Sequence, residues 1–278
     1  MLLVHQLIHF GNWNKELTGI WVSKFEASRT DATFLAQGTA DNIKSVPNVK
    51  AITDISINEA YNYCLQLNAS MDSHLIKNSE WGAVAYLAYS AYGRSGNKVK
   101  PNLSSDMITG GGTSSNGATY ATTSETIFQN RYGYKTSAGM KASTTGNIYG
   151  IYDLVGGALE YVSAYVNNGE SEVATNGGSL QNASTLYLSQ AYSEGASDTS
   201  LNNYEANASV RGDGIYEVSL DGTYAWESNE IDYPSGNMPF FARGGSYYSN
   251  YNTTGIFEVA AKDGAANESI SFRIVLAP

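Results

Sequence analysis

The first strong pattern in the chain is a helical one that starts at Ser56. Ser56-Ile-Asn-Glu59 is a capping-box sequence, in which the serine side chain accepts a backbone hydrogen bond and the glutamate bonds back to the serine. The following apolar residues repeat at helical spacing and form one face: Ile57, Ala60, Tyr61, Cys64 and Leu65. We therefore predict a helix here, with Cys64 buried in its apolar face as a small hydrophobic residue rather than a reactive thiol.

A second helix is predicted to begin at Asn78 or Ser79 and to end before Gly93. Apolar residues recur along one side of it: Trp81, Val84, Ala85, Ala88 and Tyr92. Outside these two helices, short runs of alternating apolar and polar residues predict strands, and the clearest run is 19–26.

The rest of the sequence predicts long loops. Residues 94–146 are rich in Gly, Ser, Thr and Asn, and residues 165–239 are similarly irregular. Loops of this length in a compact domain are usually functional or flexible. No internal repeat and no clear linker divides the sequence. We therefore predict one domain over residues 18–278, preceded by an N-terminal stump or linker at 1–17.

The amino-acid composition limits the kinds of molecule that the protein can bind. The 278-residue chain carries 16 Lys and Arg against 26 Asp and Glu, and this formal charge of −10 argues against binding to nucleic acid or an anionic membrane. Its 21 tyrosines and 28 glycines exceed the average share, and Tyr, Ser, Gly and Asn are the residues that antibody binding loops favour. A loop-rich fold that needs turn formers and half-buried rings explains this composition equally well.

The sequence predicts no membrane insertion, because it contains no run of about 20 apolar residues. The apolar start at 1–10 has no preceding basic residue and no clear cleavage site, so it makes a poor signal peptide. It is consistent with the stump of a longer protein whose anchor lies upstream. The expected location is extracellular, at a cell surface or on a virion.

Four motifs in a fixed order carry a family resemblance: Gly19-Ile-Trp-Val-Ser-Lys-Phe-Glu26, Leu75-Ile-Lys-Asn-Ser-Glu-Trp81, Asn147-Ile-Tyr-Gly-Ile-Tyr-Asp-Leu-Val-Gly-Gly-Ala-Leu-Glu-Tyr-Val162, and Phe241-Ala-Arg-Gly-Gly-Ser246 with the later Ser271-Phe-Arg273. Together they resemble the formylglycine-generating (sulfatase-modifying) enzyme family, a variant of the C-type lectin fold. Departures from the family pattern are Ile76, Lys77, Gly157, Leu159 and Tyr161. The motifs span nearly the whole chain.

A narrower resemblance is carried by residues 77–87 and 143–154. These segments resemble a group of proteins from Firmicutes and their prophages, some of which carry surface-attachment segments. The C-terminal parts of that group resemble the variable regions of diversity-generating retroelements, which place mutable residues on a lectin-like fold. The resemblance implies a candidate variable region at 243–275.

The catalytic residues of the family are missing. Its oxidases use a pair of cysteines that binds copper, whereas Cys64 is the only cysteine here and lies far from the C-terminus. Iron-dependent relatives need a histidine cluster, and His5, His9 and His74 show no ligand spacing. Neither a nucleotide-binding loop nor a nucleophile elbow is present. We therefore predict that the protein is not an enzyme.

The resemblance also implies a structural calcium site. In the family, the turn that corresponds to residues 153–160 binds calcium through a side-chain oxygen, two backbone carbonyls and a glutamate. The matching positions here are Asp153, Gly156, Ala158 and Glu160. A tight turn that supplies carbonyls between carboxylates suits calcium, which takes about six to eight oxygen ligands. The alternative is that Glu160 caps a turn or forms a salt bridge to an arginine, so that the turn holds itself.

A candidate binding surface lies between the two C-terminal motifs. Its residues are aromatic or polar: Tyr247, Tyr248, Ser249, Asn250, Tyr251, Asn252, Glu258, Lys262, Asp263, Asn267 and Ser269. Tyrosine faces stack on sugar rings and Asn hydrogen-bonds to them, although a polar loop without any partner would have the same composition. We expect Arg243 and Arg273 to clamp loops by bidentate hydrogen bonds rather than to contact a ligand.

The sequence thus predicts an α+β fold, a single C-type lectin-like domain with two helices, a small antiparallel sheet and long loops. The predicted function is non-catalytic recognition of a protein or glycan ligand on a cell surface, through a variable surface rich in Tyr and Asn. One alternative is a structural tip or spacer domain of a fibre or pilus. Another is an enzyme, either of the sulfatase-modifying family or an unknown hydrolase.

Overall fold

The computed structural model describes residues 19–114, 117–183, 190–192 and 212–277. Within these residues the chain forms a mixed α/β structure with five α-helices and several small sheets. The predicted stump at 1–17, which contains His5 and His9, lies outside the described residues. No helix in the described part is both long enough and apolar enough to cross a membrane.

The largest sheet is built around the strand β5 (Leu159–Val166). It pairs antiparallel with β7 (Phe240–Arg243), which in turn pairs antiparallel with β8 (Val259–Lys262). It also pairs in parallel with β9 (Ile270–Phe272) near its start and with β6 (Gln190–Tyr192) near its end. The prediction of a small antiparallel sheet is therefore incomplete, because two of the pairings of β5 are parallel.

A second, antiparallel sheet joins the two ends of the described chain. The strand β10 (Ile274–Leu276) lies between β1 (Trp21–Val22) and β4 (His74–Leu75). Only Arg273 separates β10 from β9, so this arginine stands where the two sheets meet. A separate two-stranded sheet is formed by β2 (Ser28–Arg29) and β3 (Ile43–Lys44).

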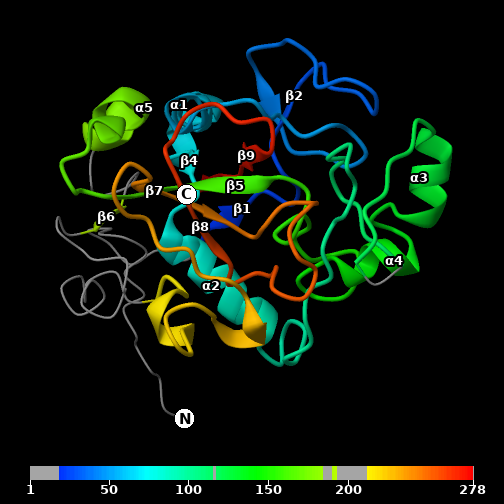
Figure 1. Ribbon diagram of the computed structural model, residues 1–278. Coiled ribbons are helices and arrows are strands. Elements are labelled where there is room, and N and C mark those ends of the chain that lie inside the picture. The colour runs from blue at the N-terminus through cyan, green and yellow to red at the C-terminus, as the bar shows by residue number, and fades with distance from the viewer. Residues whose placement is uncertain (1–18, 115–116, 184–189, 193–211, 278) are drawn as a thin grey trace.

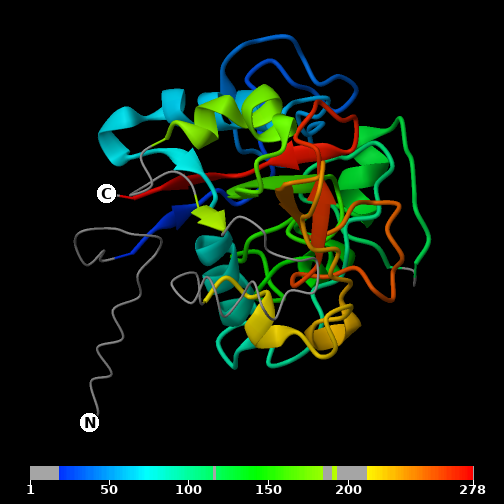
Figure 2. The same ribbon diagram turned by 60° about the vertical axis from the view of Figure 1, so that its left-hand side comes forward.

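Helices cover both faces of these sheets (Figures 1 and 2). On one side lie α1 (Ile57–Leu67) and α5 (Ser171–Gln181), and on the other lies α2 (Asn78–Tyr89). The side chains of β5 alternate between two cores: Leu159, Tyr161 and Tyr165 belong to the α1 side, and Val162, Ala164 and Val166 to the α2 side. All of β5 is buried because both of its faces are covered.

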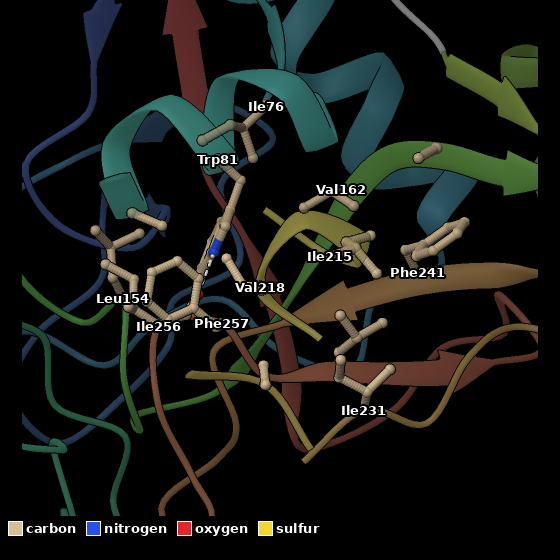
Figure 3. Packing of buried hydrophobic residues seen from close by; sticks show 14 of the residues in the cluster. Ile76, Trp81, Leu154, Val162, Ile215, Val218, Ile231, Phe241, Ile256 and Phe257 are labelled. Carbon is tan, nitrogen blue, oxygen red and sulfur yellow. Dashed lines mark hydrogen bonds between the residues drawn. The ribbon is translucent and has the colours of Figure 1, made fainter. Parts of the chain in front are cut away.

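Trp81 lies in the core beneath α2 (Figure 3), and its side chain is fully buried. The indole nitrogen donates a hydrogen bond of 2.8 Å to the backbone carbonyl of Ile256. Ile256 and Phe257 belong to the segment that follows β7, and both are in the same buried cluster. Trp81 therefore connects α2 to the segment that carries most of the predicted binding residues.

Both predicted helices are present, with one difference at the end of α2. The capping box of α1 is formed by Ser56 and Glu59, and the predicted apolar face is buried from Ile57 to Cys64. The helix α2 ends at Tyr89, and the Ser90 backbone N–H bonds back to the carbonyls of the last turn. Tyr92 was expected on the buried face, but it follows the end of the helix and is 89% exposed.

Three helices lie in segments that were predicted to be loops. These are α3 (Glu125–Arg131), α4 (Ser137–Lys141) and α5, and the first two lie together away from α5 (Figure 1). The side chains of Ser124 and Thr136 cap α3 and α4 at their N-termini. Helices of seven and five residues contain too few apolar repeats to be recognised among many Gly, Ser and Thr residues.

We expect the substitution Ser56→Ala to lower the free energy of unfolding by about 1 kcal/mol, because it removes the acceptor of the N-cap hydrogen bond. Urea denaturation monitored by circular dichroism measures the change. Ser114→Ala, at an exposed serine, is the matched control and should change stability by less than about 0.5 kcal/mol. Equal stability of the two variants would contradict the predicted contribution of this cap.

Candidate functional site

The predicted binding surface starts at a buried turn directly after β7. Gly244 and Gly245 have φ angles of 86° and 69°, which residues with side chains rarely adopt. A Cβ atom at Gly244 would lie 2.4 Å from the backbone oxygen of Leu154. Three residues later, the backbone N–H of Tyr247 donates a 2.9 Å hydrogen bond to the carbonyl of Gly157. The start of the surface is therefore held against the 153–158 turn.

Arg243 fixes the strand end just before this turn. It is fully buried, and its guanidinium donates to the carbonyls of Glu258, Asp213 and Gly214 and to the side chain of Asn78, at 3.0 to 3.2 Å. These partners lie on separate segments of the chain. Arg243 therefore clamps loops by hydrogen bonds to carbonyls, as predicted, but its four bonds go to four different residues rather than forming a bidentate pair.

Beyond the turn, the exposed chain borders a polar hollow of about 750 Å³, which we call the Tyr248 groove. The rings of Tyr247 and Tyr248 meet edge to face, with centroids 5.1 Å apart. The hydroxyl of Tyr248 is 3.1 Å from the hydroxyl of Ser269, which lies just before β9. Asn267 also lines the groove, and the rest of the lining consists of Gln37, Thr53, Asp54, Ser105, Met107 and Glu268.

A second hollow, of about 540 Å³, lies at the next residues of the same segment, and we call it the Lys100 hollow. Its lining consists of Lys100, Gly117, Ser249, Asn250, Tyr251 and Asn252. The Nζ atom of Lys100 donates to the Tyr251 hydroxyl at 2.7 Å and lies 5.1 Å from the centre of that ring. The segment 247–252 therefore contributes its first two residues to one hollow and its last four to the other.

Three of the predicted binding residues lie away from both hollows. Glu258 was expected on the surface, but its side chain is buried and only 8% exposed. Lys262 pairs with Phe240 at the far end of β8, and the carbonyl of Asp263 accepts a bond from Asn176 of α5. For Lys262 and Asp263 the physical reason is the antiparallel pairing of β7 and β8, which carries the chain away from the tyrosines. Glu258 instead lies against the turn, where a Cβ atom at Gly245 would be 2.5 Å from its carboxylate.

The lining residues from distant parts of the chain were not predicted. They are residues 37, 53, 54, 105 and 107 in the Tyr248 groove, and 100 and 117 in the Lys100 hollow. A 2.8 Å backbone hydrogen bond from Asp54 to Asn267 holds the segment 53–54 beside the Tyr248 groove. No local sequence pattern marks such residues, because only tertiary contacts bring them together.

The turn at 153–158 is packed against a buried cluster of three carboxyl groups. Glu26, Asp153 and Glu160 are at most 1% exposed, and Arg273 donates to the two oxygens of Glu160 at 2.5 and 3.0 Å. Burial raises the pKa of Asp153 to about 6 and that of Glu160 to about 7. Burial and the charges of the two other carboxylates raise the pKa of Glu26.

The residues of the predicted calcium site are engaged in other hydrogen bonds. Both oxygens of Asp153 accept bonds from the backbone N–H of Gly110, and the Asn102 side chain donates to one of them. Arg273 occupies the oxygens of Glu160, which is the alternative that the sequence left open. At the other two matched positions, Gly156 has a φ of 73° and the Ala158 N–H donates to Glu26. Because Arg273 is bonded to both oxygens of Glu160, a calcium ion at this turn would have to displace that arginine.

Calcium binding itself stays an untested prediction. Among the described residues, no group of three or more His, Cys, Asp and Glu side chains is arranged to hold a metal ion. The prediction requires the melting temperature of chelator-treated protein to rise when calcium is added. An unchanged melting temperature would contradict it.

Cys64 and His74 are buried, and their surroundings indicate a structural role. Cys64 is fully buried, and burial raises the pKa of its thiol well above the ordinary value, as expected for an unreactive cysteine. The His74 ring lies 2.9 Å from a carboxylate oxygen of Glu80, and both side chains are completely buried. Neither residue lines the Tyr248 groove or the Lys100 hollow.

Comparison with known proteins does not identify this site. No protein-family model and no curated protein sequence matches the chain. The proposals below therefore depend on the geometry of the two hollows and on the motifs described above.

We expect the substitution Arg273→Met to lower the free energy of unfolding by about 3–5 kcal/mol, because it leaves Glu160 buried without its cation. Arg131→Met, at an exposed arginine of α3, is the control and should have little effect. Adding Glu160→Gln to Arg273→Met should recover part of the loss, since the double variant no longer buries that charge. Chemical denaturation measures all three, and a double variant less stable than Arg273→Met would contradict the explanation.

We also expect the protein to be more stable near pH 5.5 than near pH 8. A buried carboxyl group whose pKa is higher in the folded state than in the unfolded state contributes stability that is fully present below the unfolded pKa. That contribution is lost as the pH rises through the folded pKa. Burial raises the pKa of Glu258 to about 7. Glu258→Gln should therefore reduce the loss between the two pH values by about 1–2 kcal/mol.

The control for this measurement is Glu125→Gln, at an exposed position of α3. Its unfolding free energy should follow the parent protein at both pH values. A stability that increases from pH 5.5 to pH 8, or a Glu258→Gln variant with the same pH dependence as the parent, would show that these carboxyls are ionised in the folded protein.

Proposed function

We propose that this protein is a non-catalytic recognition protein that binds a glycan in the Tyr248 groove. The observation that carries the proposal is the exposed ring of Tyr248, which is 58% accessible, beside a second tyrosine and a polar lining. Sugar rings stack on aromatic faces, and the amide NH₂ group of the exposed Asn267 can donate to sugar hydroxyls, while Ser269 bonds to the Asn267 oxygen and to the Tyr248 hydroxyl. Both kinds of contact are available in one hollow.

A glycan suits this hollow better than a protein partner does. A specific protein interface buries about 800 Å² on each partner and has an apolar, well-packed centre. The Tyr248 groove is concave, and Met107 is the one aliphatic side chain in its lining. Hydrogen-bonding groups dominate it, as the recognition of a hydroxyl-rich ligand requires.

We further propose that the scaffold is C-type lectin-like, as the motifs imply. The proposal is supported by the pairing of β1 with β10, by helices α1 and α2 on opposite sides of the sheets, and by the long irregular segments between the strands. The non-catalytic assignment is supported by Cys64, the single cysteine of the chain, which is buried in the α1 core. An extracellular or virion location and diversification by a retroelement are proposals from the sequence resemblance.

We expect Tyr248→Ala to weaken glycan binding by roughly tenfold, because it removes the exposed stacking surface. Tyr247→Ala should have a similar or smaller effect. The matched control is Tyr149→Ala, which removes a tyrosine that is 82% exposed and lines neither hollow. Glycan arrays followed by calorimetry on the bound sugars provide the measurement.

Binding that is unaffected by both groove variants would remove this surface from consideration. Absence of binding to any glycan, with equal melting temperatures for all variants, would reject glycan recognition and favour the structural tip or spacer. A neighbouring reverse transcriptase gene with a near-copy of the 243–275 coding region, differing at adenines, would test diversification separately.

A further inference from the structure

Cationic side chains gather at the Lys100 hollow, although the whole chain carries a charge of −10. Lys98 and Lys100 lie two residues apart in the sequence, and Arg94 donates a 3.3 Å hydrogen bond to the backbone carbonyl of Lys98. Lys98 and Lys100 both reach the segment 249–252. A locally positive hollow on an acidic protein attracts anions that the rest of the surface repels.

The two lysines at the hollow are bonded to neutral oxygens. Lys100 donates to the Tyr251 hydroxyl at 2.7 Å, and Lys98 donates to the backbone carbonyl of Asn252 at 3.2 Å. Within the described residues, neither lysine lies within 4.0 Å of a carboxylate. Each ammonium group can donate up to three hydrogen bonds, so both retain capacity for an anionic acceptor.

One carboxylate lies near these cations, but it cannot balance all of them. Burial raises the pKa of Glu227, while the charges of Lys98, Arg94 and Lys100 lower it. These three cations outnumber the one carboxylate that they act on. The side chains of Ser249, Asn250 and Asn252 line the same hollow as Lys100.

We propose that the Lys100 hollow binds the negatively charged group of an acidic glycan, a carboxylate or a sulfate. This inference rests on the proposed glycan recognition and names the class of sugar. Lys100 supplies the charge-assisted hydrogen bond, and the neighbouring Ser249 and Asn250 supply neutral donors and acceptors for the ring hydroxyls. Because 247–248 line one hollow and 249–252 the other, one oligosaccharide can lie against Tyr248 and place its acidic residue at Lys100.

The test uses an array of matched acidic and neutral glycans with the full chain. The carboxylate pair is oligogalacturonate and its methyl ester, and the sulfate pair is sulfated dextran and dextran. We expect the acidic member of at least one pair to bind about tenfold more tightly than its neutral counterpart. Raising the salt from about 50 mM to about 300 mM should weaken that preference by screening.

Lys100→Met should abolish the preference, and Lys100→Arg should restore it because the charge is kept. The control is Lys135→Met, since Lys135 also lies over a tyrosine, with its Nζ 5.4 Å from the ring centre of Tyr134, but outside the hollow. Melting temperatures confirm that each variant is folded. Loss of the preference in Lys135→Met but not in Lys100→Met would overturn the assignment.

Equal binding of acidic and neutral members would also overturn the inference, while leaving glycan recognition intact if Tyr248→Ala still weakens both. Absence of binding to every member of the array by the parent protein would reject the proposed function together with the inference. The failure of the acidic specificity and the failure of glycan recognition are therefore distinguished by the neutral glycans and the Tyr248 variant.

Discussion

The buried ion pair between Arg273 and Glu160 is the interaction on which the rest of this structure depends. Apart from Glu160, the guanidinium donates to the carbonyls of Ser23 at 2.7 Å and Tyr152 at 2.8 Å. One side chain near the C-terminus therefore connects the first strands, the turn before β5 and β5 itself. Burying the charge is favourable only because so many of its donors are bonded. Three distant segments consequently depend on one residue for their relative positions.

The same cluster determines where the exposed tyrosines lie. Gly157 is tightly packed against it, since a Cβ atom there would be 2.7 Å from a carboxylate oxygen of Glu26. On its other side, the Gly157 carbonyl accepts the backbone hydrogen bond from Tyr247. Past Tyr247, the bonds to distant segments come from side chains, as from Lys100 to the Tyr251 hydroxyl, while the backbone N–H of Asn252 donates locally to the Asn250 side chain at 3.0 Å. A rigid base thus carries a tip that is held chiefly by side-chain hydrogen bonds.

The sequence was informative where a local pattern has one physical cause. The capping box at Ser56 and the apolar face ending near Cys64 predicted α1, and the buried roles of both motif arginines followed from their hydrogen-bonding capacity. Eight of the eleven predicted binding residues line the two hollows. The opposite walls, including Asp54 and Lys100, could not be predicted, because long-range backbone contacts place them. The helix α5 was missed since its Gly177–Gly178 pair interrupts the helical pattern.

The two hollows carry charges of opposite sign, so a charged ligand can bind across them in one orientation better than in the other. The Tyr248 groove contains the exposed carboxylates of Asp54 and Glu268, whereas Lys100 and Lys98 lie at the other end of the 247–252 segment. Charges separated by less than a Debye length of about 8 Å act on one another even at physiological salt. An anionic group on a ligand is therefore repelled at one end and attracted at the other. Repulsion of the reversed orientation contributes to specificity in the same way as attraction in the correct one.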